Sequence, residues 1–168
     1  LAAMAERDGA VVRVSVIRAD GSSPRGAGSA MVVGPEKFSG TVGGGALELE
    51  ALKGARDMLA VGKVAQAGPW TRSWRPFPLG PSLGQCCGGA VRVLFEIYGE
   101  AERLAAKALA ETAASGGLVL HPLASGDPPV VLQSRQQARA LDLPLARIVS
   151  DMLSGASPPL PALAAVKD

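Results

Sequence analysis

The sequence predicts an α+β fold, a single domain in which helices pack against a mixed β-sheet. Short runs rich in β-branched residues, typical of strands, alternate along the chain with segments whose apolar residues recur at helical spacing. The length of 168 residues is about that of one domain, and 48% of the residues are apolar, which is enough to form a core. These observations together indicate one packed body with both kinds of element.

Several segments have the character of strands. Residues 11–17 are apolar or β-branched at nearly every position, and Asp20-Gly21-Ser22-Ser23-Pro24 ends this strand as a turn. Two further segments flank Gly34-Pro35-Glu36, which predicts a β-hairpin. The expected strands are residues 11–17, 29–33, 37–42, 91–97, 118–120 and 130–133.

Three segments are expected to be helical. The first begins at Ala46, where apolar residues start to recur at helical spacing and Glu48 lies in the first turn, a position that the helix dipole favours for an acid. Residues 101–115 form an Ala-rich helix that ends at two glycines. Apolar spacing over residues 145–153 predicts the last helix.

Composition limits the classes of partner. A formal net charge of +2 is too small to indicate a nucleic-acid or membrane surface as partner. The sequence shows no signal peptide and no long apolar run, so we expect a cytoplasmic protein. The domain is expected to span residues 1–153, and residues 154–168, rich in proline and alanine, to be a linker or tail.

Residues 70–76 interleave two tryptophans with two arginines, a pattern found in proteins that bind nucleic acids. The low net charge and the lack of another basic stripe argue against that interpretation. We expect instead a loop or strand near the ligand site that is stabilised by cation–π contacts.

Gly43-Gly44-Gly45 lies between an expected strand and the first expected helix. This arrangement directs free backbone N–H groups at an anion, although the motif matches no named phosphate loop and a tight connection is the alternative. Ser22, Ser23 and Arg25 supply hydroxyls and a guanidinium for the same anion, or else form a solvated turn.

Cys86 and Cys87 are the two cysteines of the chain and are adjacent, with glycines around them. A structural zinc site needs four ligands and the chain has one histidine, while a thioredoxin-type site needs Cys-x-x-Cys. Contact with a soft metal or a sulfur-bearing ligand is chemically reasonable. The alternative is a small buried apolar pair.

Three motifs occur in order along the chain, over roughly Val11 to Tyr98: Gly21-Ser22-Ser23-Pro24-Arg25, Thr41-Val42-Gly43-Gly44-Gly45-Ala46-Leu47-Glu48 and Leu83-Gly84-Gln85-Cys86-Cys87-Gly88-Gly89. Their order and spacing resemble the XdhC/CoxI family. The Gly-Gly-Gly-x-Leu-Glu and Gln-Cys-Cys-Gly-Gly sequences favour the XdhC branch over the CoxI-like branch.

The resemblance implies an accessory chaperone rather than an enzyme. Members of the family bind the molybdenum cofactor, hold it while a cysteine desulfurase supplies the terminal sulfido ligand, and deliver it to apo-xanthine dehydrogenase. The cofactor's phosphate suits glycine N–H groups and Arg25, and its metal–dithiolene end suits thiols, which places Cys86 and Cys87 near molybdenum. The residues expected at the cofactor are Ser22, Ser23, Arg25, Gly43, Gly44, Gly45, Glu48, Gln85, Cys86, Cys87, Gly88 and Gly89.

The chain departs from the family pattern after Ile97, where nothing shows a strand followed by the Gly-rich loop of the family's usual C-terminal Rossmann-like domain. It therefore resembles the N-terminal half of such a protein. The alternative functions are a thiol-dependent redox or sulfur-transfer enzyme that uses Cys86 and Cys87, and an interaction domain that binds no small molecule. We expect the face carrying Gly43–Gly45 and Gln85–Gly89 to bind the client or a second copy of the chain, as a homodimer.

Overall fold

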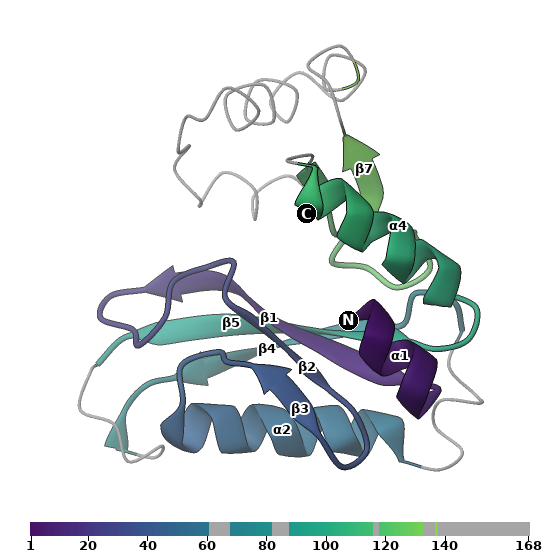
Figure 1. Ribbon diagram of the computed structural model, residues 1–168. Coiled ribbons are helices and arrows are strands. Elements are labelled where there is room, and N and C mark those ends of the chain that lie inside the picture. The colour runs from purple at the N-terminus through teal and green to yellow at the C-terminus, as the bar shows by residue number, and fades with distance from the viewer. Residues whose placement is uncertain (61–67, 82–87, 116–117, 133–136, 138–168) are drawn as a thin grey trace. The chain divides into compact units, whose positions relative to one another are not determined.

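The computed structural model describes residues 1–60, 68–81, 88–115, 118–132 and 137 (Figure 1). These residues fall into two compact units. The first comprises residues 1–106 and 123–127, and the second comprises the described parts of residues 107–122 and 128–168. The helix expected at residues 145–153 and the linker expected at residues 154–168 lie outside the described residues.

A five-stranded sheet with the strand order β3-β2-β1-β5-β4 forms the centre of the first unit. Its four ladders are antiparallel, and an isolated parallel bridge joins Ser22 to Gly88. The α+β fold class predicted from the sequence is confirmed. The elements of this unit are α1 (Ala2–Asp8), β1 (Val11–Asp20), β2 (Ala30–Val33), β3 (Phe38–Gly40), α2 (Gly45–Leu59), β4 (Arg72–Pro78) and β5 (Ala90–Tyr98).

The predicted strands of this unit are present, with shifted ends. β1 continues past the predicted end at residue 17, and a β-bulge between Val16 and Arg18 shifts its pairing with β5. The tryptophan- and arginine-rich segment is the edge strand β4. The helix α1 was not predicted from the sequence, because it is only seven residues long and has no side-chain cap at its start.

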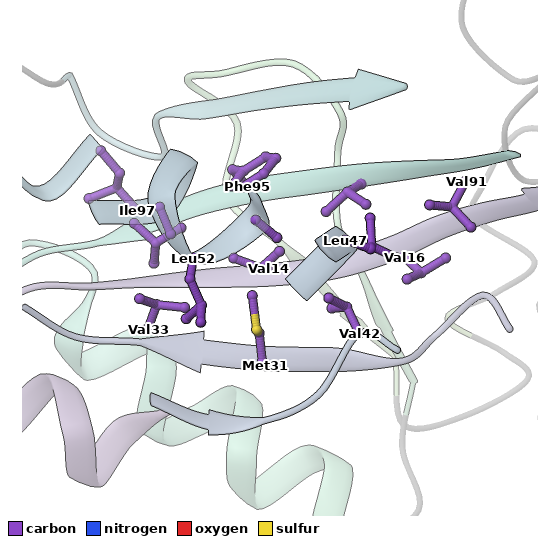
Figure 2. Packing of buried hydrophobic residues seen from close by; sticks show 14 of the residues in the cluster. Val14, Val16, Met31, Val33, Val42, Leu47, Leu52, Val91, Phe95 and Ile97 are labelled. Carbon is purple, nitrogen blue, oxygen red and sulfur yellow. The ribbon is translucent and has the colours of Figure 1, made fainter. Parts of the chain in front are cut away.

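The core lies between α2 and one face of the sheet (Figure 2). Val14 of β1 is paired with Phe95 of β5 and with Met31 of β2, and all three side chains are buried. Alternate residues of β5, and of β1 up to its bulge, belong to this cluster: Val12, Val14, Val16, Val91, Val93, Phe95 and Ile97. On α2, Leu47 and Ala51 belong to the same cluster. The apolar residues that recur at helical spacing in the sequence therefore form the face of α2 that packs on the sheet.

The guanidinium of Arg75 packs against the middle of α2 at Gly54, where a side chain would crowd it. Arg75 of β4 lies over the ring of Phe95, with 5.3 Å from its Cζ atom to the ring centroid. A Cβ added at Gly54 would lie 3.2 Å from Arg75 Nη1 and 3.4 Å from Phe95 Cε1. A larger residue would therefore push Arg75 away, and the cation–π contacts expected of this strand are confirmed. Arg92 and Trp74 make a second such contact, at 5.4 Å.

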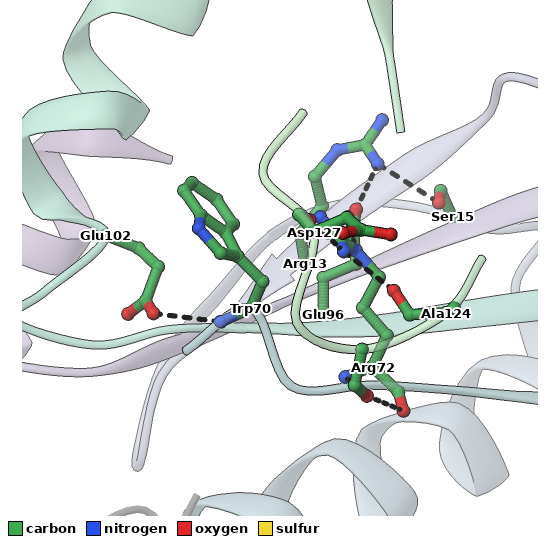
Figure 3. Close-up of polar contacts among 9 residues, drawn as sticks. Arg13, Ser15, Trp70, Arg72, Glu96, Glu102, Ala124 and Asp127 are labelled. Atoms are coloured by element: carbon green, nitrogen blue, oxygen red, sulfur yellow. Dashed lines mark hydrogen bonds and ion pairs between the residues drawn. The ribbon is translucent and has the colours of Figure 1, made fainter. Parts of the chain in front are cut away.

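The opposite face of the sheet carries a buried polar network (Figure 3). Glu96 of β5 binds Arg72 of β4 on one side, with 2.9 Å between Nε and Oε1, and Arg13 of β1 on the other, with 2.8 Å between Nη1 and Oε2. Arg72 Nη1 also donates to the carbonyl oxygens of Ala124 and Asp127, at 2.9 and 2.6 Å. Arg72 thus fastens the segment 123–127 to the sheet of the first unit.

The second unit contains an antiparallel pair of short strands, β6 (Leu118–Leu120) and β7 (Val130–Leu132). The helix α4 (Arg103–Ala114) runs from the first unit into the second. The predicted helix at residues 101–115 and the two predicted short strands are confirmed. No helix among the described residues is long and apolar enough to cross a membrane.

Candidate functional site

The described residues of the three sequence motifs lie close together near the N-terminus of α2. Ser22, in the turn after β1, forms a parallel bridge with Gly88, which precedes β5. Two residues later, Pro24 lies against Gly43, since a Cβ added at Gly43 would be 2.9 Å from Pro24 Cγ. The structure therefore brings together parts of the chain that lie more than sixty positions apart in the sequence.

Gly89 allows the closest of these approaches. A Cβ added at this residue would lie 2.7 Å from the carbonyl oxygen of Asp20 and would also overlap the carbonyl oxygen of Ser22. Since both obstacles are backbone atoms, no rotamer change would relieve the overlap. Glycine is thus required at position 89, because only a residue without a side chain allows the segment before β5 to approach the turn after β1.

The two glycines that end the cysteine motif are hydrogen-bonded to the residue that follows β4. Leu79, after β4, donates its N–H to the Gly89 carbonyl at 2.8 Å, and its own carbonyl accepts from Gly88 N–H at 3.0 Å. Leu79 is fully buried, so its hydrogen bonds fix Gly88 and Gly89, the base of the cysteine loop, to the core. The cofactor-site residues Gln85, Cys86 and Cys87, predicted from the sequence, lie outside the described residues.

The glycine loop leads directly into α2. Gly43, Gly44 and Gly45 have φ angles of 138°, 75° and 60°, a region of the backbone map that favours glycine. Gly44 is the N-cap residue and receives no side-chain cap, and a Cβ placed there would find nothing within 4 Å. The first N–H groups of a helix have no partner within it, so the loop leaves donors for a ligand next to open space.

Glu48 has a partner within the chain. Its Oε2 atom accepts a hydrogen bond from the Thr41 hydroxyl at 2.5 Å, and Thr41 Oγ1 in turn accepts the N–H of Gly43 at 3.1 Å. Glu48 was predicted from the sequence as a site residue, and Thr41 was not. A hydroxyl residue before the loop and an acid in the first turn resemble a capping box, which is the signal that could have identified the pair.

The turn after β1 contributes one cation. Ser23 donates its hydroxyl to the carbonyl of Arg25 at 3.0 Å, so this hydroxyl stabilises the turn. Arg25 is exposed, and no described residue accepts a hydrogen bond or ion pair from its guanidinium. Arg18 is paired with Asp20 at 2.8 Å, which leaves Arg25 as the cation of this turn that an anion can use.

The described residues give no separate metal site. Among them, no group of three or more histidine, cysteine, aspartate and glutamate side chains is close enough to hold a metal ion. Cys86 and Cys87, for which a metal contact is predicted from the sequence, lie outside the described residues.

Comparisons with known proteins agree with the motifs. The sequence model of the XdhC and CoxI family matches residues 4–67, which include the first two motifs and α2, and this match confirms the resemblance predicted from the sequence. No curated protein matches the chain.

Among solved structures, one from Bacillus halodurans, described as a crystal structure of a xanthine dehydrogenase, is similar, with a TM-score of 0.60 and 19% sequence identity. The likeness covers 84% of this chain and 47% of that one, so the chain spans about half the length of the solved structure. At this identity the likeness shows the fold.

Proposed function

We propose that this chain, which resembles the XdhC and CoxI family over residues 4–67, binds the molybdenum cofactor and serves the maturation of xanthine dehydrogenase. The family match supports a maturation-related role. The observation that carries the finer proposal is the meeting of the motif loops, through the Ser22–Gly88 bridge and the contact of Pro24 with Gly43. One ligand with two chemically different ends accounts for motifs that are separate in sequence and adjacent in space.

The phosphate of the cofactor fits the described part of the site. Gly44, the N-cap of a 15-residue helix, has open space beside it, and Arg25 adds a positive charge in the neighbouring turn. Backbone N–H groups and a guanidinium are the donors that bind phosphate in proteins. Ser22 is exposed in the same turn, while Ser23 and Glu48 are used in hydrogen bonds within the chain.

The metal end of the cofactor is assigned to the cysteine loop. The bound cofactor supplies a molybdenum–dithiolene centre, for which thiolates are suitable soft neighbours. Leu79, Gly88 and Gly89 fix the base of the loop next to the turn that carries Arg25. We assign to the chain the roles of binding and orienting the cofactor, while a cysteine desulfurase supplies the sulfido ligand and apo-xanthine dehydrogenase receives the product. In this role the chain is a chaperone of the cytoplasm and not an enzyme.

The proposal is tested by the content of molybdenum and pterin in protein purified from a host that makes the cofactor. Arg25→Ala should lower both contents together, because it removes the cation of the phosphate site. Arg56→Ala is the matched control: Arg56 is also an exposed arginine, but it lies in the last turn of α2 and bonds the carbonyl of Glu36.

Equal molybdenum and pterin contents in the parent and Arg25→Ala would contradict the assignment. A covalent persulfide on a cysteine in protein without pterin would instead favour a sulfur-transfer enzyme. Binding of xanthine dehydrogenase without any small molecule would favour an interaction domain.

A further inference from the structure

One side-chain pair closes the glycine loop. Thr41 lies just after β3, and its N–H donates to the carbonyl of Ala30 at 3.2 Å, which continues the β2–β3 pairing. Glu48 lies in the first turn of α2. The hydrogen bond of 2.5 Å between the Thr41 hydroxyl and Glu48 Oε2 therefore ties the end of a strand to the start of a helix, across the loop between them.

The same hydroxyl fixes the first glycine. Thr41 Oγ1 accepts the N–H of Gly43, and the Cβ direction of Gly43 is blocked by Pro24. A hydroxyl has one proton and two acceptor positions, so a Thr41 that donates to Glu48 keeps lone pairs for Gly43. Gly43 is therefore held by the hydrogen bond to Thr41 and by the contact with Pro24, whereas Gly44 has open space beside it.

The charge of Glu48 argues against direct contact with a phosphate. Two anions placed next to each other repel, while the helix N-terminus and Arg25 attract an anion. Its described hydrogen bond runs to Thr41. We infer that Thr41 and Glu48 are positioning residues that set the conformation of the glycine loop, and that Gly44 and Gly45, not Glu48, meet the ligand. The second half of this inference rests on the proposed function.

This role requires a hydrogen-bond acceptor at position 48 and a hydroxyl at position 41, but no charge. Glu48→Gln keeps an acceptor oxygen and removes the charge, whereas Glu48→Ala removes both. Thr41→Ser keeps the hydroxyl, whereas Thr41→Val removes it with little change of shape. Glu48→Gln and Thr41→Ser are therefore expected to keep the parental conformation of the glycine loop, and Glu48→Ala and Thr41→Val to lose it.

The first measurement is amide hydrogen exchange at Gly43 in the ligand-free chain. Thr41→Val and Glu48→Ala should speed this exchange by about tenfold, the equivalent of one ordinary hydrogen bond. Thr41→Ser and Glu48→Gln should leave it near the parental rate. Equal exchange at Gly43 in all five proteins would overturn the positioning role, and the melting temperature of each variant shows that it is folded.

The second measurement is binding of molybdenum cofactor released from a purified molybdoenzyme. Thr41→Val and Glu48→Ala should weaken binding by about tenfold, with Thr41→Ser and Glu48→Gln close to the parent. If Glu48→Gln binds as poorly as Glu48→Ala while Gly43 exchange is unchanged, the carboxylate contacts the ligand directly and the inference is wrong. If the parent binds no cofactor, the proposed function fails, and the exchange experiment still decides the positioning role.

Discussion

Arg72 and Glu96 face each other across β4 and β5 with both side chains shielded from solvent. Their Nε and Oε1 atoms are 2.9 Å apart, and the side chains are 0% and 2% exposed. Glu96 also binds the partly exposed Arg13, and Arg72 binds the carbonyls of Ala124 and Asp127 (Figure 3). The pair therefore joins three strands and the segment 123–127 into one network.

Breaking this pair from one side should strongly destabilise the first unit. Arg72→Met removes the buried partner of the Glu96 carboxylate and frees two backbone carbonyls, so the free energy of unfolding should fall by about 3–5 kcal/mol. Urea unfolding measures this change. Arg18→Met, which breaks the exposed pair with Asp20, is the control and should have little effect. A similar fall in the free energy of unfolding in both variants would mean that the buried network stabilises the protein no more than an exposed ion pair does.

Tyr98 should not ionise while the protein is folded. Burial raises the pKa of Tyr98 well above its ordinary value of about 10, and the nearby Glu96 carboxylate adds to this effect. In the unfolded chain the phenol ionises near pH 10, so the folded state holds more protons above that pH. Stability is unaffected by this group below pH 10 and should fall by up to about 1.4 kcal/mol for each pH unit above it.

The chain has one tyrosine, which makes the experiment simple. Tyrosinate absorbance should appear only together with unfolding, and Tyr98→Phe should lessen the loss of stability at high pH. Among the described residues the Tyr98 hydroxyl has no hydrogen-bond partner, so the substitution itself should cost little. Tyrosinate absorbance that rises near pH 10 in the folded protein would show that Tyr98 is accessible to solvent.

Gly89→Ala should separate the turn after β1 from the base of the cysteine loop. The added Cβ meets the backbone of Asp20 and Ser22, and overpacking of this kind typically costs about 1–3 kcal/mol. Gly26→Ala is the control, since a Cβ at Gly26 finds nothing within 4 Å and its φ angle is not in the region that favours glycine. Thermal unfolding and amide exchange at Ser22 compare the two variants, and a Gly89→Ala protein that matches Gly26→Ala in both would contradict the close contact.

Local patterns in the sequence were sufficient to predict most elements of the first unit. A run of apolar and β-branched residues marks β1, and helical spacing marks α2, because side chains of both elements are buried in the same core. The short helix α1 carries too few residues for a periodic signal. β4 mixes proline, arginine and tryptophan, and its pairing with β5 is what makes it a strand.

The site was predicted as a list of motifs, and its geometry was not. Nothing local in Ser22 or Gly88 indicates that they pair, because this bridge depends on the path of the whole sheet. The Thr41–Glu48 bond is different, because its ends are seven residues apart and resemble a capping box, a local pattern from which it could have been predicted.

Replacing Cys86 and Cys87 together with serine should reduce the molybdenum retained by the purified protein while leaving its melting temperature nearly unchanged. The reason is that serine keeps the size of cysteine and loses the soft thiolate that suits the metal. Metal analysis and thermal unfolding of the double variant provide the two readouts. Parental retention combined with a much lower melting temperature would instead identify the cysteines as a buried apolar pair.

Hydrogen-exchange mass spectrometry with added molybdenum cofactor can test whether the three motifs form one binding site. Peptides covering residues 20–25, 41–48 and 88–92 should all become protected, in the same proportion as cofactor is bound, since the Ser22–Gly88 bridge and the Pro24–Gly43 contact place them together. Peptides of β6 and β7 should be unchanged. Protection confined to β6 and β7, or to one of the three motifs alone, would contradict a single binding site.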